Sequence, residues 1–225
     1  MYAPMGEVLR LIAADSHELS AYRADPEGVP RGGIVLVQEI FGVNAHIREV
    51  ADRFASEGYA VIAPALFDRI ERGVELDYSE ETTAKGRALR GELGWEAPLK
   101  DIQAALKTLR PAGKVAVIGF CWGGSLAWLA ACHLKADGAV CYYGAQIRDF
   151  THEPPACPVL MHFGENDPLI PPAAVAEIAA AHPDIPIFTY PAGHGFNCDR
   201  RGDFHAPSAA LAWDRTRAFL SKQIG

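Results

Sequence analysis

Short apolar segments rich in β-branched residues alternate along the chain with segments of helical character, and this alternation constrains the fold most strongly. Six segments have the composition of buried strands: 32–39, 59–66, 114–120, 139–144, 159–164 and 185–191. Their almost continuous apolar character is typical of a parallel sheet that is buried on both faces. The segments predicted to be helices lie between and after them, at 45–57, 96–109, 124–135, 173–181 and 209–221. The pattern therefore predicts an α/β protein with a mostly parallel, twisted sheet and helices on both faces.

Three further features complete the predicted organisation. Residues 6–24 predict an antiparallel hairpin around Asp15 and Ser16, which adds edge strands, and Ser208 is the predicted N-cap of the last helix. The charged, strand-poor segment 68–94 is predicted to form a lid or cap over one end of the sheet. Because the chain contains no Gly- and Ser-rich linker, internal repeat or low-complexity tract, we expect residues 1–225 to form a single domain.

Charge and cysteine content restrict the partners and the compartment. The 21 Lys and Arg residues against 28 Asp and Glu residues give a net charge of −7. Nucleic acids and anionic membranes bind basic surfaces, so we expect neither as a partner. The N-terminal segment contains no apolar stretch of signal-peptide length. The chain has five cysteines and no CxxC motif, so we expect a cytoplasmic protein without a disulfide framework.

The strongest chemical signal is the sequence GFCWGG at 119–124, which follows an apolar strand and precedes a helix. It has the G-x-C-x-G form of a nucleophile elbow in which Cys121 replaces serine. Glycines on both sides allow the nucleophile to adopt a strained backbone conformation and to stand clear of its neighbours. The backbone N–H of Trp122 and the helix N-terminus would then face developing negative charge. A buried structural cysteine is the alternative, and the flanking glycines favour the nucleophile.

A nucleophilic thiol needs a base, and the base needs a group that orients it. Asp167 follows the strand VLMHFG, and His194 follows the next strand in the sequence PAGHGF. Singly, each is typical of a loop or turn. Together, the order Cys121, Asp167, His194 is the chain order of the catalytic triad in α/β-hydrolases, with each residue after a different strand. The sequence therefore predicts a single-domain α/β-hydrolase fold with a Cys-His-Asp triad.

A second signal lies after the first strand of the predicted parallel sheet. Glu39 ends this strand and points to the same rim, where a carboxylate beside the thiol would disfavour the thiolate form until substrate arrives. The alternative is a solvated loop carboxylate. The backbone N–H of Ile40 lies in the loop that supplies the second oxyanion donor in this fold. Ile40 and Trp122 are therefore the predicted oxyanion hole.

These residues resemble a known family. The sequences QEIFGVNAHIR (38–48), GFCWGG (119–124), GENDPLIP (164–171) and PAGHGF (191–196) are similar to motifs of the dienelactone hydrolases, also called carboxymethylenebutenolidases. The likeness covers roughly residue 30 to the C-terminus. It implies that Cys121 is the nucleophile, His194 its base and Asp167 the orienting acid. It also implies that Glu39 is the carboxylate that switches the thiol to thiolate when substrate binds.

The chain departs from the family pattern where two arginines hold a substrate carboxylate. Cys198 stands four residues after His194, and Thr83 stands at the upstream position. Nearby residues are expected to contact the substrate instead: Phe41, Arg87, Arg90 and Arg200, with Arg201 next to them. The alternative for these arginines is solvated surface charge.

The nucleophile also restricts the substrate. A thiolate leaves easily, so its tetrahedral adduct collapses backwards unless the leaving group of the substrate departs readily. Enol lactones and other activated esters meet this condition, simple alkyl esters do so poorly, and we predict no cleavage of peptides. The predicted activity is hydrolysis of an activated ester or lactone such as dienelactone through a thioester acyl-enzyme.

Other functions fit the sequence less well. His194, Cys198, Asp199 and His205 match the spacing of no common closed zinc site, so we expect no metal. The glycines at 119–124 do not form the pattern G-x-G-x-x-G, so we expect no dinucleotide and no other cofactor. A hydrolase-like fold that only binds a small molecule remains an alternative, as does a thiol hydrolase of another activated ester.

Overall fold

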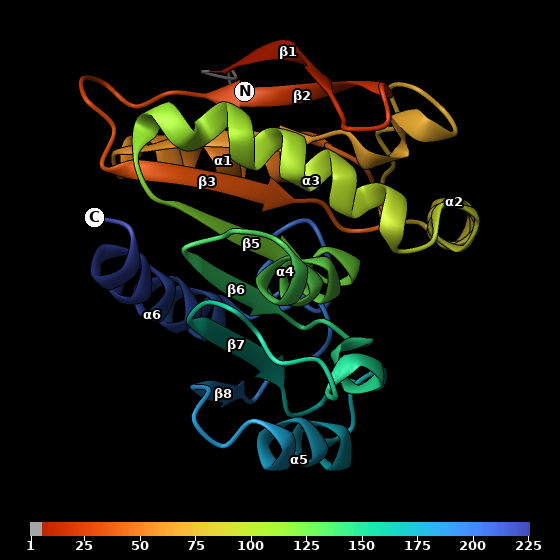
Figure 1. Cartoon of the computed structure of the whole chain (residues 1–225). Coiled ribbons are helices and arrows are strands. Elements are labelled where there is room, and N and C mark those ends of the chain that lie inside the picture. Colours follow the sequence, from red (N-terminus) through yellow and green to blue (C-terminus); the bar gives the residue numbers. More distant parts are fainter. Residues whose placement is uncertain (1–5) are drawn as a thin grey trace.

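The computed structural model describes residues 6–225, and eight strands in this part of the chain form one sheet. The strands are β1 (Glu7–Ile12), β2 (Glu18–Ala24), β3 (Gly32–Val37), β4 (Tyr59–Pro64), β5 (Val115–Phe120), β6 (Gly138–Tyr142), β7 (Val159–Gly164) and β8 (Ile187–Tyr190). Their order in the sheet is β1-β2-β4-β3-β5-β6-β7-β8 (Figure 1). The predicted strands are confirmed, although several end one or two residues earlier than expected.

The sheet is parallel except at one edge. Strands β3 to β8 pair in parallel, whereas β1 and β2 form an antiparallel hairpin and β2 pairs antiparallel with β4. The predicted hairpin is therefore confirmed, and Ser16 in its turn has a φ of 66°. Every residue of β3, β4, β5, β6 and β7 is buried, as expected for strands covered on both faces.

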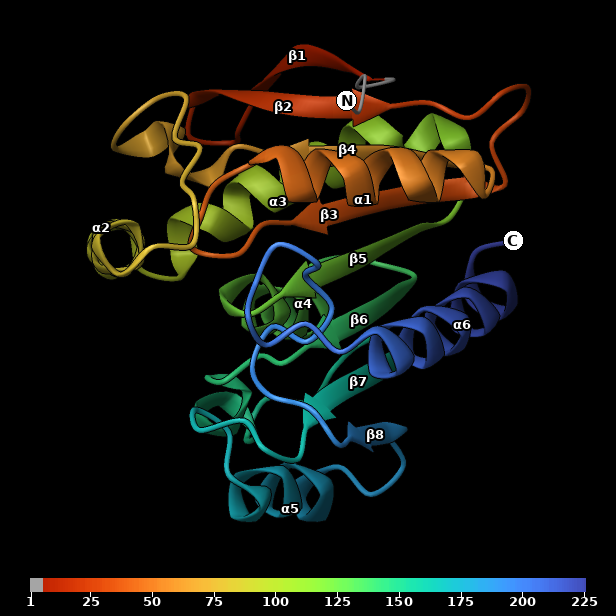
Figure 2. The same ribbon diagram turned by 180° about the vertical axis from the view of Figure 1, so that it is seen from behind.

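Helices cover the two faces of the sheet. They are α1 (Ala45–Ser56), α2 (Glu80–Leu93), α3 (Glu96–Leu109), α4 (Trp122–His133), α5 (Pro172–Ala181) and α6 (Ala206–Gln223). Figures 1 and 2 show α3 and α4 over one face of the sheet and α1 and α6 over the other, while α2 lies at one end. Apolar residues of the sheet and of these helices form one continuous core. None of the helices in residues 6–225 has both the length and the apolar character required to cross a bilayer.

One local prediction is wrong, and one segment has more regular structure than expected. The segment 68–94, which was predicted to form a lid or cap, contains α2, whose N-cap residue Ser79 accepts a hydrogen bond from the backbone N–H of Thr82. Ser208 does not cap the last helix. That helix begins at Ala206 after the N-cap residue His205, because Pro207 has a φ suited to a first helical turn. Ser208 lies inside that turn, with its Oγ 2.6 Å from Nδ1 of His205.

Candidate active site

The carboxyl ends of four parallel strands bring the predicted site residues to one edge of the sheet. Glu39 lies two residues after β3, and Cys121 directly follows β5. Asp167 lies three residues after β7, and His194 lies four residues after β8. Ligands of open α/β sheets bind at this edge, because loops at the ends of parallel strands can point side chains into one crevice.

Cys121 occupies a sharp turn between β5 and α4. Its φ of 55° and ψ of −119° are strained for a residue with a side chain. The turn also requires glycine at position 123, two residues after Cys121, because a Cβ on Gly123 would collide with the carbonyl oxygens of Val37 and Gln38. The backbone N–H of Gly124 donates to the carbonyl oxygen of Cys121 at 2.9 Å, which begins the helix. The thiol thus stands at the N-terminus of α4, where the helix dipole favours negative charge.

His194 bridges the thiol and the carboxylate. Its Nε2 lies 3.1 Å from Sγ of Cys121, and its Nδ1 lies 2.7 Å from Oδ2 of Asp167. The other carboxylate oxygen of Asp167 accepts a hydrogen bond of 2.8 Å from the backbone N–H of Leu169, which fixes the orientation of the acid. His194 and Asp167 are buried and Cys121 is partly exposed, so solvent or a ligand reaches the group at the sulfur end.

Burial, the thiol of Cys121 and the carboxylate of Asp167 all affect the pKa of the His194 imidazole. Burial lowers the pKa of His194, but the charge of Cys121 and the hydrogen bond to Asp167 outweigh burial and raise the pKa to about 10. The ordinary value for histidine is about 6.5. The imidazole therefore holds a proton most strongly when the neighbouring sulfur is negatively charged. This arrangement suits a thiolate–imidazolium pair, the reactive form of a cysteine nucleophile.

Glu39 is fully buried and pairs with Arg201. Its Oε1 accepts a hydrogen bond of 3.1 Å from Nη1 of Arg201. The neighbouring Gln38 holds the loop in place, because its Oε1 accepts a hydrogen bond from the backbone N–H of Leu66. Burying a carboxylate without a partner is costly, so the guanidinium accounts for much of the stability of Glu39 in this position.

A cavity over Cys121 contains most of the remaining predicted residues. Ile40, Phe41 and Trp122 line one part of it, and Ala145, Gln146, Leu169 and His194 line another. Helix α2 closes the end of the cavity. It approaches the loop after β3 closely, since a Cβ on Gly86 would collide with the carbonyl oxygen of Ile40. The backbone of both predicted oxyanion residues, Ile40 and Trp122, therefore borders the same space as the thiol.

Three arginines line this cavity. Arg87 and Arg90 lie with Thr83 on one side of α2, at spacings of three and four residues that place them on a common helix face. Arg201 reaches the cavity from the loop after β8. Arg200 does not belong to this set. Its guanidinium pairs with Glu49 of α1, and Arg200 does not line the cavity over Cys121, so the structure does not bring it together with the other predicted substrate-binding residues.

One further residue at the site, Tyr143, was not predicted from the sequence. Tyr143 follows β6 with a φ of 39°, and its ring packs edge-on against His194 with 5.2 Å between the ring centroids. The side chain is buried and helps to hold the imidazole in place. The sequence placed Tyr143 inside the predicted strand 139–144, whereas β6 ends at Tyr142, so its position at the strand end was not foreseen.

Comparisons with known proteins agree with the motifs. A family model described as the dienelactone hydrolase family matches residues 19–224. A carboxymethylenebutenolidase of Pseudomonas putida is 33% identical over 226 residues, which cover 96% of each chain. A protein of Synechocystis sp. that is assigned as a carboxymethylenebutenolidase is 35% identical over 229 residues, with 92% of this chain and 93% of the relative covered.

A solved structure extends the agreement to the fold. A protein of Klebsiella pneumoniae subsp. pneumoniae that is assigned as a dienelactone hydrolase superposes with a TM-score of 0.85. The two chains are 28% identical, and the match covers 96% of this chain and 99% of the other. The similarity in fold therefore extends over almost the whole chain.

Proposed function

The chain belongs to the dienelactone hydrolase family, and from this premise we propose that it hydrolyses activated esters and lactones with Cys121 as its nucleophile. One observation carries the proposal: His194 lies within hydrogen-bond distance of both Cys121 Sγ and Asp167 Oδ2, at 3.1 and 2.7 Å. A nucleophile, a base and an orienting acid in this geometry form the arrangement that acyl transfer requires. A module that only binds a small molecule has no use for it.

The reaction begins with the thiolate of Cys121 and the protonated His194. The sulfur attacks the acyl carbon, a C–S bond forms, and the carbonyl electron pair moves to the oxygen. Collapse of this adduct breaks the C–O bond of the ester, and His194 donates its proton to the leaving oxygen. Water then attacks the thioester, gives its proton to His194, and the thiolate leaves as the acid product is released.

Two backbone amides are proposed to stabilise the oxyanion. The N–H groups of Ile40 and Trp122 belong to residues that line the cavity around Cys121, and Trp122 opens helix α4. Such donors stabilise negative charge strongly in a site from which water is excluded. Gly86 packs against the carbonyl of Ile40, which constrains the backbone on the C-terminal side of this residue.

We propose that the substrate carries a carboxylate near the reactive ester. Arg87, Arg90 and Arg201 give the cavity a positive lining that suits an anion. A carboxylate that binds Arg201 competes with Glu39 for the same guanidinium, which links substrate binding to the carboxylate of Glu39. In this proposal α2 serves as the cap that presents Arg87 and Arg90, and an enol lactone such as dienelactone satisfies both the charge and the leaving-group requirement.

The compartment that we propose is the cytoplasm. All five cysteines are free thiols, and a reducing environment keeps a thiol nucleophile available. The partner is a small-molecule ester or lactone.

The test is hydrolysis of dienelactone followed by ultraviolet absorbance, with p-nitrophenyl acetate as a second substrate. We expect wild type to turn over dienelactone and the Cys121→Ala variant to lose this activity. Turnover of p-nitrophenyl acetate alone would retain the triad and reject the carboxylated lactone. Dienelactone turnover in Cys121→Ala at the wild-type rate would reject the nucleophile.

A further inference from the structure

A second cluster of reactive side chains lies behind the loop after β3. Glu39, His46 and Cys198 are all buried, and one ligand atom of each lies within 4.8 Å of the others. Glu39 follows β3, His46 lies in the first turn of α1, and Cys198 lies in the loop between β8 and α6. A carboxylate, an imidazole and a thiol are together the donor types that bind zinc and similar cations.

Two atoms of the cluster are buried without a hydrogen bond. Within residues 6–225, neither Oε2 of Glu39 nor Nε2 of His46 has a hydrogen-bond partner. The other oxygen of Glu39 is held by Arg201, and Nδ1 of His46 lies 3.5 Å from Oδ1 of Asp199. An unpartnered buried polar atom costs free energy, so two of them in one cluster point to a ligand that accepts their electron pairs.

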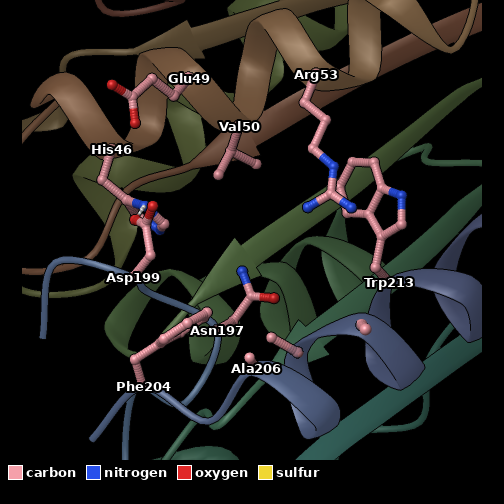
Figure 3. Close-up of a pocket in the computed structure, with 11 residues that line it drawn as sticks. His46, Glu49, Val50, Arg53, Asn197, Asp199, Phe204, Ala206 and Trp213 are labelled. Carbon is pink, nitrogen blue, oxygen red and sulfur yellow. Dashed lines mark ion pairs between the residues drawn. The ribbon is translucent and has the colours of Figure 1, made fainter. Parts of the chain in front are cut away.

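The carboxylate of Asp199 favours the tautomer of His46 that carries its proton on Nδ1. Figure 3 shows the side chain of Asp199 against His46, with a dashed line between the two groups. A proton on Nδ1 of His46 that faces this carboxylate leaves the electron pair of Nε2 free. Metal-binding histidines commonly donate their second ring N–H to a carboxylate in this way, which fixes the tautomer and increases the basicity of the ligand.

Cys198 supplies the sulfur ligand. Burial and the nearby carboxylate of Glu39 raise the pKa of Cys198 to about 12, while the hydroxyl of Tyr78 and the backbone N–H of Arg200 lower it to a smaller extent. A cation that binds the sulfur therefore has to displace the thiol proton. The positive charge of Arg201 opposes cation binding, whereas the Glu39 carboxylate favours it.

We propose that Glu39, His46 and Cys198 form a site for a thiophilic divalent cation of the zinc type. The three ligands leave a fourth tetrahedral position for water. Ideal metal–ligand bonds place neighbouring ligand atoms about 3.5 Å apart, so binding requires the side chains to close by roughly 1 Å. Cys198 forms a bond to the cation and releases its proton to solvent, with no change of oxidation state.

Of the three residues in the cluster, only His46 lines a surface pocket. His46 lines two surface pockets, one of which lies between α1 and the loop before α6 and is drawn in Figure 3. The site was not expected from the sequence. Of its three ligands, only Cys198 was among the residues that the sequence analysis considered as possible zinc ligands. The cluster shares Glu39 with the proposed hydrolase site but includes neither Cys121 nor His194, so metal binding can be measured separately from hydrolysis.

The test uses Co²⁺ as a spectroscopic probe in the full chain carrying Cys121→Ser, which removes the thiol of the candidate active site. We expect saturable binding of one Co²⁺ with a thiolate-to-cobalt charge-transfer band in the near ultraviolet, displaced by Zn²⁺. The band should disappear in Cys198→Ser and remain in the control Cys157→Ser, both in the same background. A folded Cys198→Ser protein is recognised by its unchanged melting temperature in the presence of a chelator.

A second variant tests the histidine without disturbing the core. Asp199 is 59% exposed, so Asp199→Asn should leave the fold unchanged. We expect it to weaken Co²⁺ binding by about tenfold or more. An absence of saturable binding, a charge-transfer band that persists in Cys198→Ser, or unchanged affinity in Asp199→Asn would each overturn the proposed site.

Discussion

The guanidinium of Arg201 and the carboxylate of Glu39 form a buried ion pair at 3.1 Å, and the arginine also lines the cavity over Cys121. Only 1% of the Glu39 side chain and 18% of the Arg201 side chain is exposed. The guanidinium of Arg201 therefore balances the buried charge of Glu39 and also faces any anion that enters the cavity. This relationship connects the stability of the loop after β3 with the binding of substrate.

Removing one partner of this pair should destabilise the protein more than removing both. We expect Arg201→Gln to lower the free energy of unfolding by about 3 kcal/mol, because Glu39 is left charged and buried. Adding Glu39→Gln to this variant should restore most of the loss. Urea unfolding measures both effects. The exposed pair of Arg217 and Glu57 is the control, and Arg217→Gln should cost less than about 1 kcal/mol. Additive effects at Glu39 and Arg201 would contradict the account.

The cavity arginines should distinguish charged from neutral substrates. We expect Arg87→Gln and Arg90→Gln to raise KM for a carboxylated aryl ester by roughly tenfold, because each removes a charged hydrogen-bond donor. KM for p-nitrophenyl acetate should change little. Arg200→Gln is the matched control, since Arg200 pairs with Glu49 outside the cavity. Equal effects of all three variants would indicate a general field effect instead of direct contacts.

The strained turn at Cys121 predicts an unusual order of stability among variants at this position. Cys121 has a φ of 55°, which is strained for any side chain but not for glycine. Cys121→Gly should therefore be more stable to thermal unfolding than Cys121→Ala by about 1 kcal/mol. Inside helices and strands, by contrast, glycine destabilises a folded protein relative to alanine. A less stable Cys121→Gly would show that the turn stores no strain.

His162 should make the protein sensitive to acid. Burial lowers the pKa of His162 to about 3, and its ring nitrogens lie 2.8 Å from Oη of Tyr190 and 3.0 Å from Oγ1 of Thr216. In the unfolded chain the pKa is about 6.5, so the unfolded state binds more protons between these values. Stability should therefore fall as the pH decreases from about 6.5 toward 3.

A variant isolates this contribution to acid sensitivity. His162→Gln keeps polar groups in the position but cannot be protonated. We expect its stability, measured by urea unfolding, to fall less steeply over the same pH range than that of wild type. Parallel pH profiles of the two proteins would show that His162 does not contribute.

The strands, and the positions of the candidate triad residues at their ends, could be predicted because each depends on local sequence. Apolar segments such as VAVIGF and VLMHFG have few alternatives to a buried strand. Strand ends then bring together residues such as Cys121 and His194 that are far apart in the chain. Helix α2 was missed because it buries only Gly86 and Leu89, which leaves almost no apolar periodicity to read.

Other features depend on tertiary packing. Arg200 and Arg201 are adjacent and chemically identical in the sequence, yet one pairs with Glu49 on the surface and the other with buried Glu39. The cluster of Glu39, His46 and Cys198 also could not be predicted, because three separate loops and helix ends meet there. Residues that come together only when the sheet and helices pack cannot be recognised from their spacing in the sequence.

The most direct test of the central claim is detection of the acyl-enzyme. Wild-type protein mixed with p-nitrophenyl acetate and quenched in acid within the first turnover should carry one acetyl group, located on Cys121 by peptide mass spectrometry. The Cys121→Ala variant should carry none and should lose the initial burst of p-nitrophenol. An acetyl group on another residue, or a full burst in Cys121→Ala, would contradict the assignment of Cys121 as the nucleophile.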